Sequence, residues 1–309
     1  MISGRSSAVK VTPVSKLLCE LRITVMLFRR LARAALPLPL LLLLVLVTGC
    51  SLLDGGGSSA SSHKIDQEED VISSNGGGIS NLDKLDSFME RGSGSQRVVH
   101  YTIEGDPVFT ELRYEGGRLE LSYDTTEDAF GSREVKTYSC NELVRTEEKH
   151  QLKYSLKGCE GAMGDGDLLT VSFDLGSQDK FEFILKYGFN LRNEINTVNQ
   201  NLVKDMLNGT VIEISDYGLP VEDRQSIYRK LVLSNYLGEK QLSTSCNLKP
   251  YESYDLTVLI NSAERHYAWS ECDTGRDGKT MTEAADYIIG LVESGDTFLQ
   301  LPAATGGVK

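Results

Sequence analysis

The stretch YDLTVLINSAERHYAW, residues 254–269, contains the clearest fold signal in the chain. Every second residue from 254 to 260 is apolar, which is the period of a strand buried on one face. Asn261-Ser262-Ala263 then supplies turn-forming residues, and residues 264–269 form a second strand pattern. The stretch therefore predicts an antiparallel hairpin, and it favours a fold built on antiparallel sheet.

Further strands and helices are predicted around this hairpin. Apolar residues alternate along Phe181–Tyr187, which predicts another strand. Pro220 is a favourable residue for the start of a helix. Thr280, with Glu283 three residues later, forms a capping box that predicts the start of a second helix. Together these elements predict an α+β domain over residues 178–301.

The first half of the chain shows the same mixture of patterns. Ser80 has the character of a helix cap, because apolar residues follow it at helical spacing. Strands are predicted over residues 99–103, 108–114, 118–123, 152–157 and 169–173. We therefore expect a first α+β domain over residues 65–176. A flexible tail is expected at 302–309.

An apolar run at residues 34–49 follows three arginines and directly precedes Cys50. A basic region, a short apolar region and small residues at the cut are typical of a secretory signal peptide. The run is shorter than the ~18 apolar residues of a spanning helix. Val47-Thr48-Gly49-Cys50 resembles the lipobox of bacterial lipoproteins. The resemblance implies that Cys50 receives a lipid and that the mature protein is attached to the outside of the cell membrane.

The residues around this run divide into three predicted parts. Residues 26–49 have the length of an ordinary signal peptide, so Met26 is the expected start of translation and residues 1–25 an upstream extension. Residues 50–64 are rich in glycine and serine, and they predict a flexible tether. The alternative is an uncleaved N-terminal membrane anchor, with Cys50 unmodified.

The charge of the chain limits its partners. The whole chain has a net charge of −12. Residues 1–49 hold 7 of the 32 basic residues but only Glu20 of the 44 acidic ones, so the rest of the chain has a net charge of −18. Such a surface argues against nucleic acid as a partner. It also argues against electrostatic attachment to an anionic bilayer, so membrane contact is expected through the lipid alone.

Four cysteines are left once Cys50 and the upstream Cys19 are set aside. They are Cys140, Cys159, Cys246 and Cys272. Since two fall in each half of the mature chain, the simplest pairing is one local bridge per domain, Cys140–Cys159 and Cys246–Cys272. A loop of about 20 residues closed in this way gains about 3 kcal/mol in the chain-entropy model. The alternative is four buried free thiols, because export does not guarantee oxidation.

Most catalytic and metal-binding motifs are absent from the sequence. The four histidines are scattered, and neither H-E-x-x-H, G-x-S-x-G nor a phosphate-binding loop occurs. Asp273–Gly278 partly matches a calcium loop but lacks two of the required oxygen ligands, and Gly164–Asp167 has the residues of a hairpin turn. We therefore expect no metal and no cofactor. Glu104 and Asp106 are the candidate ligand-loop residues, although Gly-Asp-Pro is also good turn chemistry.

Two resemblances extend beyond the lipobox. Five segments of the first domain resemble a domain of unknown function found in lipoproteins of Gram-positive spore-forming bacteria. These segments are Asp70–Ile72, Asn81–Leu85, Tyr101–Pro107, Tyr138–Cys140 and Leu156–Cys159. The second domain is similar to an uncharacterised C-terminal module of exported proteins, through Tyr187-Gly188, Asn193–Thr197, Lys204–Met206, Ile227–Lys230 and Leu301-Pro302. Neither resemblance implies an activity.

Three functions fit these observations. The leading hypothesis is a non-catalytic lipoprotein that binds an unknown protein or a cell-envelope component. The second is an envelope or extracellular hydrolase that uses carboxylates such as Glu104 and Asp106. The third is a solute-binding lipoprotein of a transporter, but such proteins need parallel βαβ lobes, which the antiparallel patterns do not predict.

Overall fold

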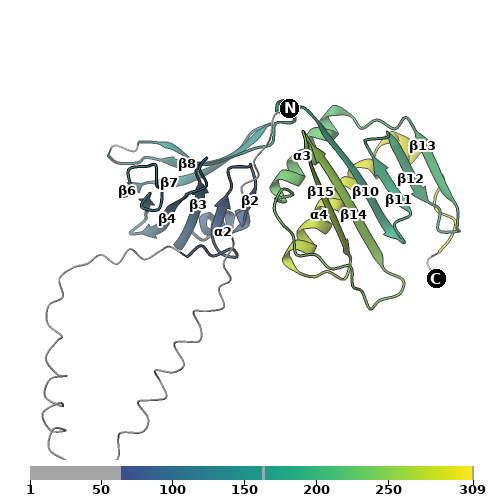
Figure 1. Ribbon diagram of the computed structural model, residues 1–309, viewed down its shortest axis with the longest axis horizontal. Helices are drawn as coiled ribbons and strands as arrows, with labels where there is room; N and C mark the ends of the chain where they lie inside the picture. The colour runs from purple at the N-terminus through teal and green to yellow at the C-terminus, as the bar shows by residue number, and fades with distance from the viewer. Residues whose placement is uncertain (1–63, 162–163, 308–309) are drawn as a thin grey trace, which may run out of the picture. The chain divides into compact units, whose positions relative to one another are not determined.

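The computed structural model describes residues 64–161 and 164–307 (Figure 1). The predicted signal peptide, Cys50 and nearly all of the predicted tether lie outside these residues. Within them, no helix combines the length and the apolar character needed to cross a membrane. The strands form three sheets whose pairs are antiparallel with one exception, and a few helices accompany them. This arrangement confirms the predicted α+β class, and the grouping of the sheets suggests two small domains.

The first sheet has six strands in the order β2-β1-β3-β4-β5-β6. Its strands are β1 (Val71–Ser73), β2 (Ile79–Ser80), β3 (Gly94–Tyr101), β4 (Pro107–Glu115), β5 (Arg118–Asp124) and β6 (Val135–Cys140). Only β1 and β3 pair in parallel. Helix α2 (Leu82–Arg91) buries Leu85 and Phe88, and the Phe88 ring stacks on Tyr114 of β4 at 4.9 Å between centroids. The helix therefore covers a core formed by this sheet.

A smaller sheet follows, made of β7 (Glu142–Glu147), β8 (Gln151–Lys157) and β9 (Gly166–Ser172) in the order β7-β8-β9. The fully buried Tyr154 of β8 donates its hydroxyl to Asp86 Oδ1 of α2 at 2.6 Å. Burial and the neighbouring Asp86 carboxylate raise the pKa of the Tyr154 hydroxyl. This bond joins the small sheet to the helix on the first sheet.

Cys140 and Cys159 are paired where the chain passes from the first sheet to the second. Cys140 is the last residue of β6, and Cys159 follows the end of β8. Two backbone hydrogen bonds flank the pair, from Asn141 N–H to the Lys157 carbonyl at 2.9 Å and from Glu160 N–H to the Ser139 carbonyl at 2.9 Å. The bridge therefore closes the end of the β7–β8 pair and ties it to the first sheet.

The third sheet belongs to the second half of the chain, after the short 3-10 turn η2 (Leu175–Ser177). Its strands are β10 (Phe181–Phe189), β11 (Asn193–Asn196), β12 (Asn201–Asp205), β13 (Val211–Ser215), β14 (Glu252–Ile260) and β15 (Ala263–Ser270). The order is β13-β12-β11-β10-β14-β15, so β14 returns after three intervening strands to pair with β10. The hairpin predicted from residues 254–269 is β14–β15, and positions 254, 256, 258 and 260 are all buried as predicted.

Three helices belong to this half: α3 (Val221–Leu233), α4 (Arg276–Glu293) and the short α5 (Asp296–Leu299). Figure 1 shows α4 running across one face of the third sheet. The Trp269 side chain of β15 is fully buried; it stacks on Tyr254 at 5.1 Å, and its Nε1–H donates to Thr282 Oγ1 of α4 at 2.9 Å. Trp269 therefore connects the hairpin with the helix that covers it.

Two predicted helix starts were wrong. Helix α2 is preceded by Asn81 rather than Ser80, which ends β2. Asn81 has a left-handed φ of 60°, and its side-chain amide donates to the Asp70 carbonyl at 2.5 Å, so a tertiary contact selects the asparagine. Helix α4 begins at Arg276, four residues before the predicted capping box, and Thr280 therefore lies inside it. Its N-cap, Gly275, donates its N–H to the Asp273 carboxylate at 3.1 Å.

The strand predicted over residues 99–103 was also wrong in its extent. Strand β3 starts at Gly94 and ends at Tyr101. Ile103 lies in the turn that follows and is 82% exposed. The alternation continued past the strand because a turn residue happened to be apolar, and alternation alone does not show where pairing stops.

The contact between Trp269 and Thr282 gives a prediction for stability. Substitution Thr282→Val keeps the shape of the side chain but leaves the buried indole N–H without an acceptor, which should cost about 1–3 kcal/mol of unfolding free energy. Urea unfolding of the full chain measures this loss. Thr280→Val is the matched control on the same helix, and it should change the unfolding free energy by less than about 0.5 kcal/mol. Equal losses in both variants would contradict the role given to the bond.

Candidate ligand-binding site

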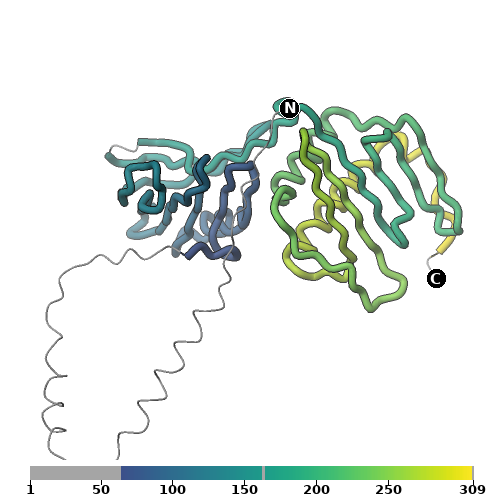
Figure 2. The backbone as a smooth tube through the Cα atoms, viewed as in Figure 1, coloured from purple at the N-terminus to yellow at the C-terminus, as the bar shows by residue number. Residues whose placement is uncertain are grey.

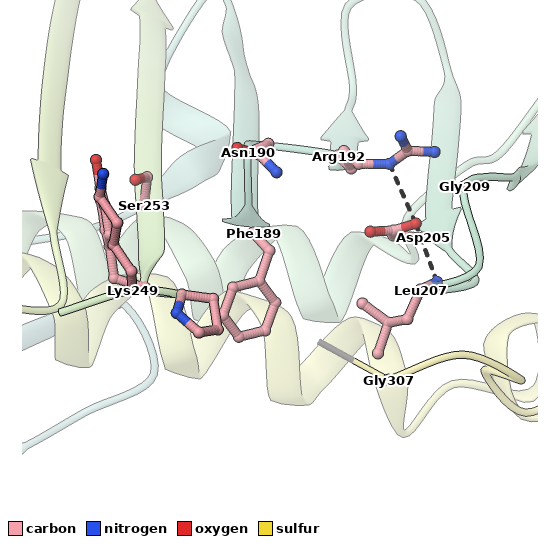
Figure 3. A pocket seen from close by; sticks show the side chains of 11 residues that line it. Phe189, Asn190, Arg192, Asp205, Leu207, Gly209, Lys249, Ser253 and Gly307 are labelled. Carbon is pink, nitrogen blue, oxygen red and sulfur yellow. Dashed lines mark hydrogen bonds and ion pairs between the residues drawn. The ribbon is translucent and has the colours of Figure 1, made fainter. Parts of the chain in front are cut away.

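A cavity of about 470 Å³ opens at one end of the third sheet (Figure 3). Its lining comes from four separate segments of the chain, namely residues 189–192, 205–209, 249–253 and Gly307. The volume lies within the range of about 300–1,000 Å³ that small-molecule sites usually have. The cavity is therefore the candidate functional site in the described part of the chain.

The sheet order brings the first and third of these segments together. Phe189, the last residue of β10, lies opposite Glu252, the first residue of β14, in the antiparallel register. The chain then leaves β10 through Asn190 and Leu191, which both have a left-handed φ of 55°. Gly188 precedes this turn with a φ of 82°, and a Cβ there would lie 2.7 Å from the Asn193 amide. The turn places Asn190 and Arg192 at the rim of the cavity.

Arg192 is held by the carboxylate of Asp205, at the end of β12. The Asp205 side chain is only 5% exposed, and its Oδ1 accepts hydrogen bonds from Arg192 Nε at 3.2 Å and from the Leu207 N–H at 3.1 Å. The Asp205 N–H donates in turn to Asn193 Oδ1 at 2.8 Å. The carboxylate therefore contacts the guanidinium through Nε alone, and the dashed lines in Figure 3 mark this contact and the bond to Leu207.

Lys249 reaches the cavity on a long irregular segment between α3 and β14. Two carboxylates near the start of α4 hold this segment: Asp273 Oδ2 accepts from Ser243 N–H at 2.7 Å, and Asp277 Oδ2 accepts from Gln241 N–H at 2.8 Å. Cys246 is also paired with Cys272. These are the aspartates of the partial calcium loop in the sequence, and the structure uses them to bind backbone amides.

The C-terminal segment forms the remaining edge. Figure 2 shows it beside the turn that joins β12 and β13. The N–H groups of Thr305 and Gly306 donate to the Met206 carbonyl at 3.2 and 3.1 Å, and Lys204 Nζ donates to the Pro302 carbonyl at 3.0 Å. A Cβ on Gly306 would lie 1.8 Å from the Leu207 carbonyl oxygen, so only glycine fits there. Residues 302–306 of the predicted tail thus make specific contacts and bring Gly307 to the cavity.

The lining has a cationic and an apolar side. Figure 3 shows Lys249 and Arg192 on either side of Phe189, with the Asn190 amide between them and Leu207 below Arg192. Asp205 is the one carboxylate among the residues that line the cavity, and it is already paired with Arg192. The site therefore has a net positive charge within an acidic protein. It offers N–H and O–H donors beside an apolar surface, which suits ligand binding.

The candidate residues named from the sequence lie elsewhere. Glu104 and Asp106 belong to the turn between β3 and β4, where Glu104 is exposed. The Asp106 N–H donates to Thr102 Oγ1 at 3.1 Å, and its Oδ2 accepts the Ala129 N–H at 2.9 Å. Asp106 thus stabilises its own turn and joins it to the loop at Ala129. Neither residue lines the cavity.

The two cysteine pairs of the structure are those that the sequence favoured, Cys140–Cys159 and Cys246–Cys272. Cys50 lies outside the described residues. Within residues 64–161 and 164–307, no group of three or more His, Cys, Asp or Glu side chains is arranged to hold a metal ion. The cavity residues themselves were missed by the sequence reasoning, because they come from four segments that lie far apart in the sequence.

Residues 68–155 match a family described as Domain of unknown function (DUF4362). No curated protein and no solved structure matches the chain. The matched residues contain the first sheet, α2, β7 and most of β8. This supports the assignment of the first half of the chain to an uncharacterised domain. The cavity lies outside the matched residues.

Glu252, next to cavity residue Ser253, gives a prediction for the dependence of stability on pH. Burial raises the pKa of the Glu252 carboxyl above its ordinary value of 4.5, and the charge of Glu271 adds to the effect. Below pH 4.5 the carboxyl is protonated in both the folded and the unfolded chain, so it causes no loss. As the pH rises from 4.5 through the raised folded pKa, the unfolded chain releases the proton more readily, and the fold loses stability.

Substitution Glu252→Gln should therefore raise the melting temperature at pH 7, and the gain should shrink as the pH falls below the raised pKa. Thermal unfolding followed by circular dichroism at several pH values measures it. Glu239→Gln, at an exposed position, is the control and should give no comparable gain. A gain from Glu252→Gln that is independent of pH would contradict the assignment.

Proposed function

We propose that this chain is an extracytoplasmic lipoprotein, attached to the outer face of the cell membrane by a lipid on Cys50, and that its folded part serves in binding rather than in catalysis. The observation that carries the proposal is the order of its parts. An apolar run ends at Cys50, a glycine- and serine-rich segment follows, and β1, the first strand of the described residues, starts at Val71. This order is that of an anchor, a tether and a body.

The charge and the cysteines support the same location. The chain after residue 49 has a net charge of −18, so an anionic bilayer repels it and the lipid must supply the attachment. Two lipid chains give stable attachment, whereas one gives only marginal binding. The pairs Cys140–Cys159 and Cys246–Cys272 belong in an oxidising compartment outside the cytoplasm. The first domain resembles a domain found in lipoproteins of Gram-positive spore formers, and we include such a bacterium as the source in this proposal.

The cavity favours binding over hydrolysis. A carboxylate hydrolase needs an acid and a base that face the same substrate. Asp205 is the carboxylate in the lining, and its Oδ1 is bound by Arg192 and the Leu207 N–H. Glu104 and Asp106 lie in a turn of the first sheet. The lining thus offers donors and an apolar surface, which can hold a ligand of the envelope or part of a protein partner.

The antiparallel sheets also argue against the alternative function of a transporter's solute-binding protein. Such a protein would need parallel strands alternating with helices, with the ligand at the carboxyl ends of the strands. The third sheet instead pairs β10 with β14 and β11 in antiparallel fashion. The binding role proposed here therefore does not include the two-lobed closure of that class.

Lipid attachment can be tested in a Gram-positive host fed with an alkynyl fatty acid. The full chain should take up the label, and Cys50→Ser should abolish it, because the thiol is the proposed attachment point. Ser51→Ala, next to the proposed attachment point, is the matched control and should keep the label. Mass spectrometry of the purified protein should give an N-terminus at Cys50. Equal labelling of the Cys50→Ser and unaltered chains would refute the proposed anchor.

A further inference from the structure

We propose that the cavity at the end of the third sheet binds an organic carboxylate that has an apolar group close to the carboxylate. This inference rests on the binding role proposed above and names the class of ligand. Its first support is charge: the whole chain has a net charge of −12, yet the cavity places Lys249 and Arg192 beside a single carboxylate. A positively charged cavity attracts an anion, although the negatively charged protein as a whole repels one.

The state of Arg192 gives the second support. Its Nε donates to the buried Asp205, while in the described part of the chain no contact engages Nη1 or Nη2. A guanidinium bound at Nε keeps the N–H donors of Nη1 and Nη2 available, and these donors lie in one plane. Two such donors match the two oxygens of a carboxylate. Asp205 thus acts as a positioning residue for the group that would bind the ligand.

Lys249 supplies a second positive charge from the opposite side. Its side chain is exposed, and among the described residues it forms no ion pair. The segment that carries it is fixed by Asp273, Asp277 and the Cys246–Cys272 pair. These contacts therefore hold the backbone near Lys249, while the charge of its side chain is not paired within the described fold. The amide of Asn190 and the hydroxyl of Ser253 add neutral donors to the same lining.

The apolar part of the lining selects among anions. Phe189, Pro250 and Leu207 contribute apolar surface to the cavity. Inorganic phosphate carries polar oxygens on every side, and burying them against these side chains would leave hydrogen bonds unmade. Burying a second negative charge against these apolar side chains would add a further desolvation cost. A singly charged carboxylate with an apolar substituent satisfies both sides of the cavity.

This chemistry occurs in small organic acids and at the C-terminus of a peptide that ends in an apolar residue. A suitable probe is N-acetyl-4-fluorophenylalanine, followed by fluorine NMR in the presence of the full chain in detergent micelles. Its neutral carboxamide is the matched ligand. Because the carboxamide enters micelles more readily, a preference for the carboxylate cannot arise from the detergent. An acetylated tripeptide with the same last residue distinguishes the two sources, since tighter binding of the tripeptide indicates a peptide C-terminus.

The carboxylate should bind at least about tenfold more tightly than the carboxamide. Lys249→Met should reduce its affinity by about tenfold, and Arg192→Lys, which keeps the charge but loses the planar pair of donors, should reduce it similarly. Lys157→Met removes an exposed lysine outside the cavity and should leave the affinity unchanged. Because Lys249 is exposed, its variant should fold even if Arg192→Lys does not.

Three outcomes would overturn the proposal. Equal affinity for the carboxylate and the carboxamide would remove the preference for an anion but leave a binding role for the cavity. Unchanged affinity in Lys249→Met would place the ligand elsewhere. No binding of either probe would exclude the cavity as a site for such ligands. The fatty-acid labelling of Cys50 is read separately, so failure of the anchor and failure of the ligand assignment are distinguishable.

Discussion

The antiparallel pairing of β10 with β14 is the constraint on which the second half of the structure depends. Nine residues of each strand are in register, from Phe181 opposite Ile260 to Phe189 opposite Glu252. A shift of one residue would turn the apolar face of either strand toward solvent, so the hydrophobic pattern fixes the register. The pairing closes a loop of more than sixty residues, which contains three strands and α3. The cavity exists because this closure brings Lys249 close to the end of β10.

Aspartate carboxylates serve mainly as structural acceptors around that cavity. Asp205 binds the Leu207 amide and Arg192, while Asp273 and Asp277 bind backbone amides of the segment that leads to Lys249. A carboxylate that accepts a backbone N–H satisfies a donor that would otherwise lack a partner in a segment without regular pairing. In an acidic chain, many carboxylates can therefore accept hydrogen bonds from backbone amides of its own loops. This explains why a partial calcium loop in the sequence is no evidence for a metal here.

Local sequence patterns predicted the strands in which every second side chain is apolar and packs into the core along the full length of the strand. Residues 254–260 and 181–187 alternate strictly, and both became long central strands. The shorter β11 and β12 were missed because each has so few buried apolar residues that no period develops. Ile195 and Leu202 are buried there, but their neighbours Asn196 and Asp205 are buried and polar. Such strands form because a longer neighbour supplies the hydrogen-bonding edge, which is information that lies elsewhere in the chain.

The sequence by itself determined the fold class and the hairpin at residues 254–269, because these follow from period and turn residues. It favoured the two cysteine pairings through proximity along the chain, and the structure contains both pairs. It also supplied the basis for the proposed lipid on Cys50, since targeting signals are local. Only the tertiary structure decided where α2 and α4 begin, since Asn81 and Asp273 act through contacts outside their own helices. It alone assembled the cavity, because Arg192, Asp205 and Lys249 meet through strand order and not through spacing.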